Sequence, residues 1–177
     1  LNGDTIAAAD FAVTGYTVTS AVESSAGVVT LTLTESGAPN TSATPLVAIA
    51  ALGSIEDIAG NANTSDSTAP ADGAAPVAVS AETTSINTID VTFSEDVNGA
   101  SVSPADFTVD GNAVTVSDAS GGAGVVSLTL GTAIGTGDTP LVTIAGNGAT
   151  SGIQDNANNW TTTHSIFPAD GIAPIVA

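Results

Sequence analysis

Apolar and polar residues alternate along several short stretches of the chain. Apolar residues occupy every second position over 89–93 and again over 126–130. A period of two is typical of a β-strand that buries one face. Further short runs rich in β-forming residues, separated by Gly, Asn and Asp, also predict strands. They lie at 76–81, 106–109, 113–117, 141–145 and 161–167. No stretch has the period of an amphipathic helix, so the pattern predicts an all-β fold.

The hydrophobic core predicted from these strands is poor in aromatic residues. Aromatic residues make up 3% of the chain, so Val, Ile, Leu and Ala must fill the core around single anchors such as Phe93 and Phe107. About seven short strands in a domain of this size favour a two-sheet sandwich of immunoglobulin-like type.

The sequence also repeats itself at a spacing of 95–98 residues. The matching segments are, in pairs, 1–11 with 97–107, 27–33 with 124–130, 44–50 with 139–145, 55–57 with 153–155, and 70–73 with 168–171. Such self-similarity predicts tandem copies of one domain. The turn-rich segments 71–76 and 169–174 separate the copies.

The repeat predicts three parts of unequal completeness. Residues 1–75 form an immunoglobulin-like repeat that lacks its opening strands, because they contain no counterpart of 76–96. Residues 76–173 form a complete repeat, and 174–177 form the first strand of a following repeat or a donor strand. We expect the chain to be a segment of a longer array. The gap in the first repeat would be filled by residues upstream of Leu1 or by a strand of a neighbouring subunit.

Two blocks of sequence carry a family resemblance. The first is Val91–Gly111, followed by Leu-Thr-Leu at 128–130 and Ile-Gln-Asp-Asn-Ala-Asn-Asn at 153–159. The second is Asp-Ile-Ala-Gly-Asn at 57–61 with Ala-Asp-Gly-Ala-Ala-Pro at 71–76. Both resemble repeats of bacterial and archaeal surface proteins, including S-layer-like, swimming-associated and adhesin repeats. This resemblance implies tandem immunoglobulin-like β-sandwich domains and an extracellular, cell-surface location.

The charge of the chain has one sign only. It contains 18 Asp and Glu and no Lys or Arg, so its formal net charge is −18. Nucleic acid and anionic lipid need Lys and Arg to neutralise phosphate, so neither is expected as a partner. Direct membrane insertion is not expected either, since no apolar run approaches the ~20 residues of a membrane-spanning helix. Divalent cations are the expected counter-charge.

Recurring carboxylates make calcium the predicted cofactor, because calcium takes six to eight oxygen ligands from Asp, Glu, Asn and backbone carbonyls. They lie in the loop before the final strand, in the linkers, and near the start of the second repeat. The candidate ligands are Asp57, Asn61, Asp72, Glu82, Glu95, Asp96, Asp155 and Asp170. Asp also favours turns by bonding its own backbone, so solvated turn residues are the alternative interpretation.

Three Asn-x-Ser/Thr triplets make Asn40, Asn63 and Asn159 glycosylation candidates. A chain rich in Ser and Thr also forms such triplets by chance, so unoccupied triplets are the alternative. Trp160 is the single Trp, and we interpret it as a cap on the sandwich or as a contact to a neighbouring domain.

Enzymatic chemistry is not predicted. The one histidine, His164, has no acid or nucleophile motif around it, and we interpret it as a strand residue without chemistry. The function predicted is a structural segment of an S-layer or surface filament, built of calcium-stiffened repeats. These repeats would associate with copies of the chain or with adjacent repeats of the parent protein. The alternative is a stalk or ligand-binding module of a repeat adhesin.

Overall fold

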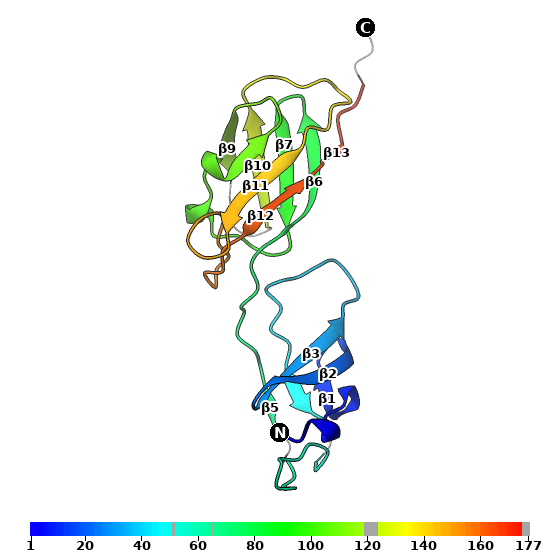
Figure 1. The fold of residues 1–177 in the computed structure, drawn as a ribbon. Coiled ribbons are helices and arrows are strands. Elements are labelled where there is room, and N and C mark those ends of the chain that lie inside the picture. Colours follow the sequence, from blue (N-terminus) through cyan, green and yellow to red (C-terminus); the bar gives the residue numbers. More distant parts are fainter. Residues whose placement is uncertain (51, 65, 119–123, 175–177) are drawn as a thin grey trace. The chain divides into compact units, whose positions relative to one another are not determined.

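The computed structural model describes residues 1–177 except 51, 65, 119–123 and 175–177. The chain forms two compact units (Figure 1). Unit 1 comprises Leu1–Ala38 and Ala43–Ala71, and unit 2 comprises Pro39–Ser42 and Asp72–Ala177. Most of the strand predicted at 174–177 lies outside the described residues.

Unit 1 contains short strands in two small antiparallel sheets. Its elements are η1 (Gly3–Thr5), η2 (Ala8–Asp10), β1 (Phe11–Val13), β2 (Thr17–Ser25), β3 (Val28–Thr34), β4 (Val47–Ile49) and β5 (Ser67–Thr68). One sheet has the order β1-β4-β5, and β2 and β3 form a separate hairpin.

Unit 2 contains a five-stranded and a three-stranded sheet. Its elements are β6 (Ala78–Ser85), β7 (Thr88–Phe93), η3 (Gly99–Ser101), η4 (Pro104–Asp106), β8 (Phe107–Val109), β9 (Val114–Asp118), β10 (Val125–Leu130), β11 (Val142–Asn147), β12 (Thr162–Ile166) and β13 (Ala169–Asp170). The sheet orders are β13-β6-β7-β10-β9 and β12-β11-β8. All pairs are antiparallel except β13 with β6.

The all-β prediction is confirmed, since the described residues contain strands and 3-10 turns but no α-helix. The strands predicted by alternation over 89–93 and 126–130 are β7 and β10. β6 begins at Ala78 and continues to Ser85, beyond the predicted 76–81, because pairing with β7 extends it. In the part of the chain that is described, no helix is long and apolar enough to cross a membrane.

The core of unit 2 draws on both of its sheets. Phe93 and Phe107, the predicted anchors, are 4% and 5% exposed. They share one cluster with the inward residues of β7, β10 and β11, among them Ile89, Leu128 and Ile144, which are fully buried. Each such side chain contributes about 1.5–3 kcal/mol on burial. The period of two places them there, because β7 and β10 bury every second residue.

His164 on β12 hydrogen-bonds to the other sheet. The Ala78 N–H on β6 donates to His164 Nε2 at 3.0 Å, and His164 Nδ1 lies 2.7 Å from the Thr162 carbonyl oxygen. Since Nε2 accepts a hydrogen bond, Nδ1 is the ring nitrogen that donates to the Thr162 carbonyl oxygen. His164 therefore has a structural contact that holds the two sheets of unit 2 together.

Equivalent strands of the two units pair in the same order. Phe11 of β1 lies opposite Ile49 of β4, and Phe107 of β8 lies opposite Ile144 of β11. The pair β4–β5 corresponds in the same way to β11–β12. The hairpin β2–β3 corresponds to β9–β10 in its strand order, with Leu33 opposite Val18 and Leu130 opposite Val114, but the bulges of the two hairpins lie at different positions. The sequence repeat is therefore also a repeat of strand topology over these elements.

Candidate metal centre

Asp155 lies in a type of turn that occurs once in each unit. Its Oδ1 accepts the Asn159 N–H at 2.8 Å, and its Oδ2 accepts Asn159 Nδ2 at 2.7 Å. In unit 1, Asp57 accepts the same two groups of Asn61, each at 2.8 Å. These hydrogen bonds, first from the Asn61 side chain and then from its backbone, lower the pKa of Asp57. The spacing Asp-x-x-x-Asn thus builds one turn in each unit.

Burial distinguishes the two turns. Asp155 is fully buried, whereas Asp57 is half-buried. The residue before the Asn adopts a left-handed conformation in both turns, as Gly60 with φ +83° and as Asn158 with φ +72°. Asn tolerates this conformation better than most residues with a side chain. The sequence difference between the two turns therefore preserves the same backbone path.

Glu95 follows β7 and is 8% exposed. The Thr41 hydroxyl donates to Glu95 Oε1, and Thr41 Oγ1 lies 2.6 Å from Ser94 Oγ. Because Thr41 has one hydroxyl hydrogen and gives it to Glu95, Ser94 must donate to Thr41. Ser94 Oγ in turn accepts the Val77 N–H at 3.1 Å. A chain of hydrogen bonds thus runs to the Glu95 carboxylate and fixes its position.

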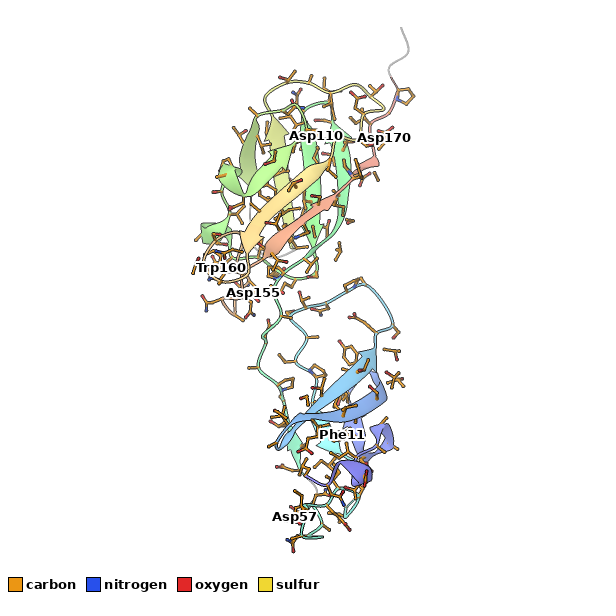
Figure 2. All side chains as sticks on the ribbon, viewed as in Figure 1. Phe11, Asp57, Asp110, Asp155, Trp160 and Asp170 are labelled. Atoms are coloured by element: carbon orange, nitrogen blue, oxygen red, sulfur yellow. The ribbon has the colours of Figure 1, made fainter. Side chains whose placement is uncertain are left out.

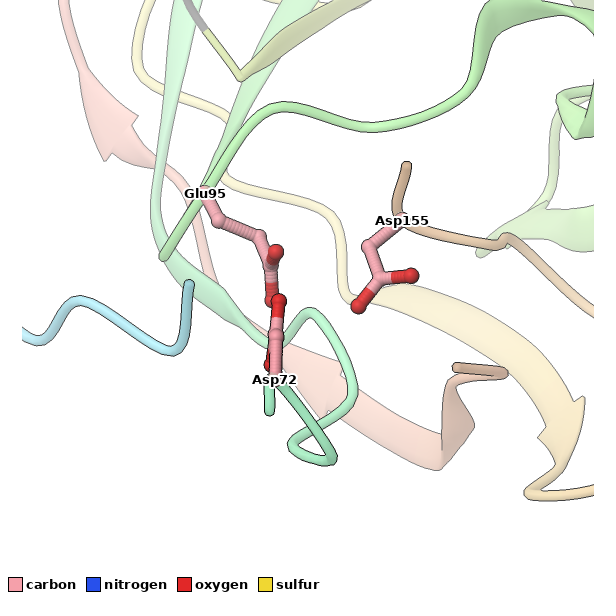
Figure 3. A group of neighbouring side chains, drawn as sticks. All are labelled: Asp72, Glu95 and Asp155. Carbon is pink, nitrogen blue, oxygen red and sulfur yellow. The ribbon is translucent and has the colours of Figure 1, made fainter. Parts of the chain in front are cut away.

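Asp72 completes a group of three carboxylates. Its Oδ1 accepts the Ala74 N–H at 3.1 Å, and its backbone oxygen accepts Asn159 Nδ2 at 3.4 Å. One carboxylate oxygen from each of Asp72, Glu95 and Asp155 lies within 4.8 Å of the other two (Figure 3). We call these three residues the acidic cluster. They come from the linker, the end of β7 and the loop before β12.

The acidic cluster concentrates negative charge in a region that is largely buried from solvent. Two unit charges at this separation repel by roughly 3 kcal/mol at the effective dielectric constant of a protein surface. Burial raises the pKa of Glu95, a hydrogen bond from Thr41 opposes that rise, and the charges of Asp155, Asp72 and Asp96 add to it. The chain has no Lys or Arg to offset these charges.

The donor atoms of the acidic cluster suit a hard divalent cation. Carboxylate oxygens are the ligands that calcium, magnesium and manganese prefer. Asp155 and Glu95 already hold their positions through hydrogen bonds from Asn159 and Thr41, and each carboxylate keeps lone pairs for a metal. The three residues that could hold such an ion are therefore Asp72, Glu95 and Asp155.

The other predicted ligands do not belong to this group of three carboxylates. Asp57 and Asn61 bond each other in unit 1. Asp96, Glu82 and Asp170 are exposed in unit 2. Figure 2 shows Asp170 at the end of unit 2 opposite Asp155, and half-buried Trp160 at the same end as Asp155.

Two supporting residues were not predicted as parts of a metal site. Asn159 holds the Asp155 carboxylate, and the repeat spacing could have indicated it, because Asn159 is the counterpart of Asn61. No sequence pattern indicated the role of Thr41, since it lies in a loop and is 54 positions from Glu95 in the sequence.

The glycosylation candidates differ in their surroundings. Asn40 is exposed, and its Oδ1 accepts the Ser42 N–H at 3.1 Å. Asn63 and Asn159 are half-buried. Asn63 Oδ1 accepts the Ile55 N–H at 2.9 Å. A glycan on Asn159 Nδ2 would replace one of the hydrogens that this atom donates to Asp155 and Asp72, so glycosylation there would disturb the acidic cluster.

Replacing Glu95 by Gln is expected to change how stability depends on pH in metal-free buffer. A carboxyl whose pKa is raised on folding binds more protons in the native than in the unfolded state. For Glu95 this difference occurs at pH values between the ordinary pKa of 4.5 and the raised pKa of the native state. Its contribution to stability therefore falls as pH rises through that window. Urea unfolding with chelator, from pH 4 to 7, should show a smaller decline for Glu95→Gln than for the wild type.

The exposed Glu82 provides the control for this measurement. Glu82→Gln should keep the wild-type difference between pH 4 and pH 7. Parallel profiles for Glu95→Gln and the wild type would contradict the electrostatic account of the acidic cluster.

Comparison of the chain with protein-family models, with curated proteins and with solved structures found no significant match.

Proposed function

We propose that the chain is a structural, non-enzymatic segment of an extracellular cell-surface protein, an S-layer or a surface filament. Its repeats are immunoglobulin-like sandwiches stiffened by calcium, and they associate with copies of the chain or with adjacent repeats. The observation that carries this proposal is the acidic cluster at the start of unit 2. It gathers three carboxylates within 4.8 Å in a chain without Lys or Arg.

The repeated topology supports the structural part of the proposal. The two sheets of unit 2 enclose one core, and unit 1 repeats the pairing order of five strands of unit 2. The resemblance of 91–111 and 57–76 to surface-protein repeats points the same way. Repetition of one rigid β-unit suits a stalk or lattice, because each unit adds length without requiring a new fold.

Calcium would act on the chain where unit 2 begins. Asp72 is the first residue of unit 2 after unit 1, and Thr41 belongs to the short segment Pro39–Ser42 that joins unit 2. Both of these segments therefore reach the acidic cluster, Asp72 as a ligand and Thr41 as a donor to Glu95. A bound ion would hold both against the sheets of unit 2 and so restrict the connections to unit 1.

The proposal is tested on cells that produce the parent protein. Antibodies raised against the chain should label intact cells without permeabilisation, and electron microscopy of their envelopes should show labelled filaments or a lattice that chelator disperses. Labelling only after permeabilisation would overturn the surface location. Glycan binding by a monodisperse chain that forms no ordered assembly would favour the adhesin alternative.

A further inference from the structure

The β3 strand of unit 1 has an open edge. In unit 2 the equivalent strand, β10, pairs with β9 on one side and with β7 on the other. Among the described residues of unit 1, β3 pairs with β2 alone. A strand edge that is paired in one repeat and free in the other is a site for strand addition.

The inward side chains of β3 lack the cover that those of β10 have. Leu128 and Leu130 of β10 are 0% and 3% exposed. Their counterparts in β3 are Leu31, which is half-buried, and Leu33, which is 37% exposed. Leu occupies these inward positions in both strands, so the difference in exposure comes from the elements packed against them.

The second sheet of unit 1 shows the same deficit. A pocket of about 210 Å³ is lined by Phe11, Val47 and Ile49 together with β5. The counterparts of these three residues are Phe107, Val142 and Ile144, which are buried in the core of unit 2. That core also contains side chains of β6 and β7. The residues that line the pocket in unit 1 therefore correspond to residues that, in unit 2, are buried in a core to which the β6–β7 hairpin contributes side chains.

A pair of glycines records the same contrast. Gly124 has a positive φ, and a Cβ atom there would collide with the backbone of Glu95, just beyond β7. Its counterpart Gly27 also has a positive φ, yet a Cβ atom there would meet nothing within 4 Å. Unit 1 thus keeps the glycine but not the strand that approaches it.

The path of the chain shows from where a hairpin could reach this edge. In unit 2 the Asn98 N–H donates to the Gln154 oxygen at 2.8 Å, a few residues after β7 ends. In unit 1 the Asn2 N–H donates to the Glu56 oxygen, also at 2.8 Å. Leu1 therefore occupies the place of Val97, which follows the β6–β7 hairpin and a short connection.

We propose that unit 1 binds, and is completed by, a β-hairpin of the 76–96 type. Its second strand pairs with the open edge of β3, and its inward apolar residues fill the pocket between β1, β4 and β5. The hairpin is recognised by backbone hydrogen bonds and by apolar residues at the positions of Ile89, Val91 and Phe93. This inference does not depend on calcium binding or on a surface location.

The test uses the full chain with a copy of residues 76–96 fused directly to Leu1. Hydrogen exchange of the β3 amides, followed by mass spectrometry, should slow by about 100-fold relative to the unfused chain, since completing the sandwich adds stability to unit 1. A control fusion carries Ile89→Ser, Val91→Ser and Phe93→Ser in the copied segment alone. It alters the amino group of Leu1 in the same way but cannot fill the pocket, so its β3 amides should exchange at the rate of the unfused chain.

The β10 amides of unit 2 serve as an internal reference and should exchange equally in all three chains. Equal β3 exchange in the two fusions would overturn the proposal. So would an unfused chain whose β3 amides are already protected in a concentration-dependent dimer, because a second copy would then occupy the edge.

Discussion

Calcium at about 100 times its dissociation constant is expected to raise the thermal midpoint of unit 2 by roughly 10–20 °C over its value in chelator. Binding to the native state alone stabilises by about 2.7 kcal/mol at that concentration, and 1 kcal/mol moves the midpoint of a domain of this size by roughly 4–8 °C. Removing the ion also restores the repulsion within the acidic cluster. Differential scanning calorimetry at low ionic strength measures the shift.

The repeat provides a matched pair of variants for this experiment. Asp155→Asn removes a carboxylate from the acidic cluster and should abolish most of the calcium-dependent shift. Asp57→Asn changes the equivalent turn of unit 1, where Asp57 binds Asn61 in the same way, and it should leave the shift of unit 2 intact. Identical melting of the wild type in chelator and in millimolar calcium would eliminate the calcium hypothesis.

The second large effect concerns the core. Leu128→Ala is expected to destabilise unit 2 by about 2–5 kcal/mol, because it removes a fully buried side chain and leaves a cavity among residues of both sheets. The equivalent change in unit 1, Leu31→Ala, should cost less than half as much, since Leu31 is only half-buried. Urea unfolding, followed by strand-resolved hydrogen exchange, separates the two units.

Equal losses at Leu31 and Leu128 would show that the core of unit 1 is already closed. Ser127→Ala is not a suitable control, since Ser127 Oγ donates to Asp90 at 2.6 Å. The exposed Thr32 of β3 is not suitable either, since its hydroxyl bonds Ser20. Val28→Ala at the exposed start of β3 is the better one, and it should change stability by less than about 0.5 kcal/mol.

Much of the strand pattern could be predicted from the sequence because it depends on neighbours along the chain. Alternation places Ile89, Val91 and Phe93 on one side of β7 whatever that strand packs against. The repeat could likewise have indicated the Asp-x-x-x-Asn turn of each unit, since its hydrogen bonds join residues four positions apart. The two-residue strand β13 was not predicted, because two residues cannot show a period.

The composition of the acidic cluster could not be predicted from local sequence. Eight residues had the oxygen chemistry of calcium ligands, and sequence alone could not choose among them. Asp72, Glu95 and Asp155 meet because the linker, the end of β7 and the loop before β12 converge at one end of unit 2. Thr41 joins them from a separate segment, 54 positions before Glu95 in the sequence. Contacts of this kind depend on how the two sheets pack, so no regular spacing of residues in the sequence indicates them.

The sequence by itself determined an all-β chain, the positions of its main strands, its internal repeat and its unbalanced negative charge, because residue types and their spacing along the chain decide each of them. The tertiary structure alone decided which carboxylates gather, and that the same Leu side chains are buried in β10 but partly open in β3. The physical reason is that burial and charge proximity are set by the strands that lie alongside. In this chain, the two copies of one sequence pattern have different strands beside them.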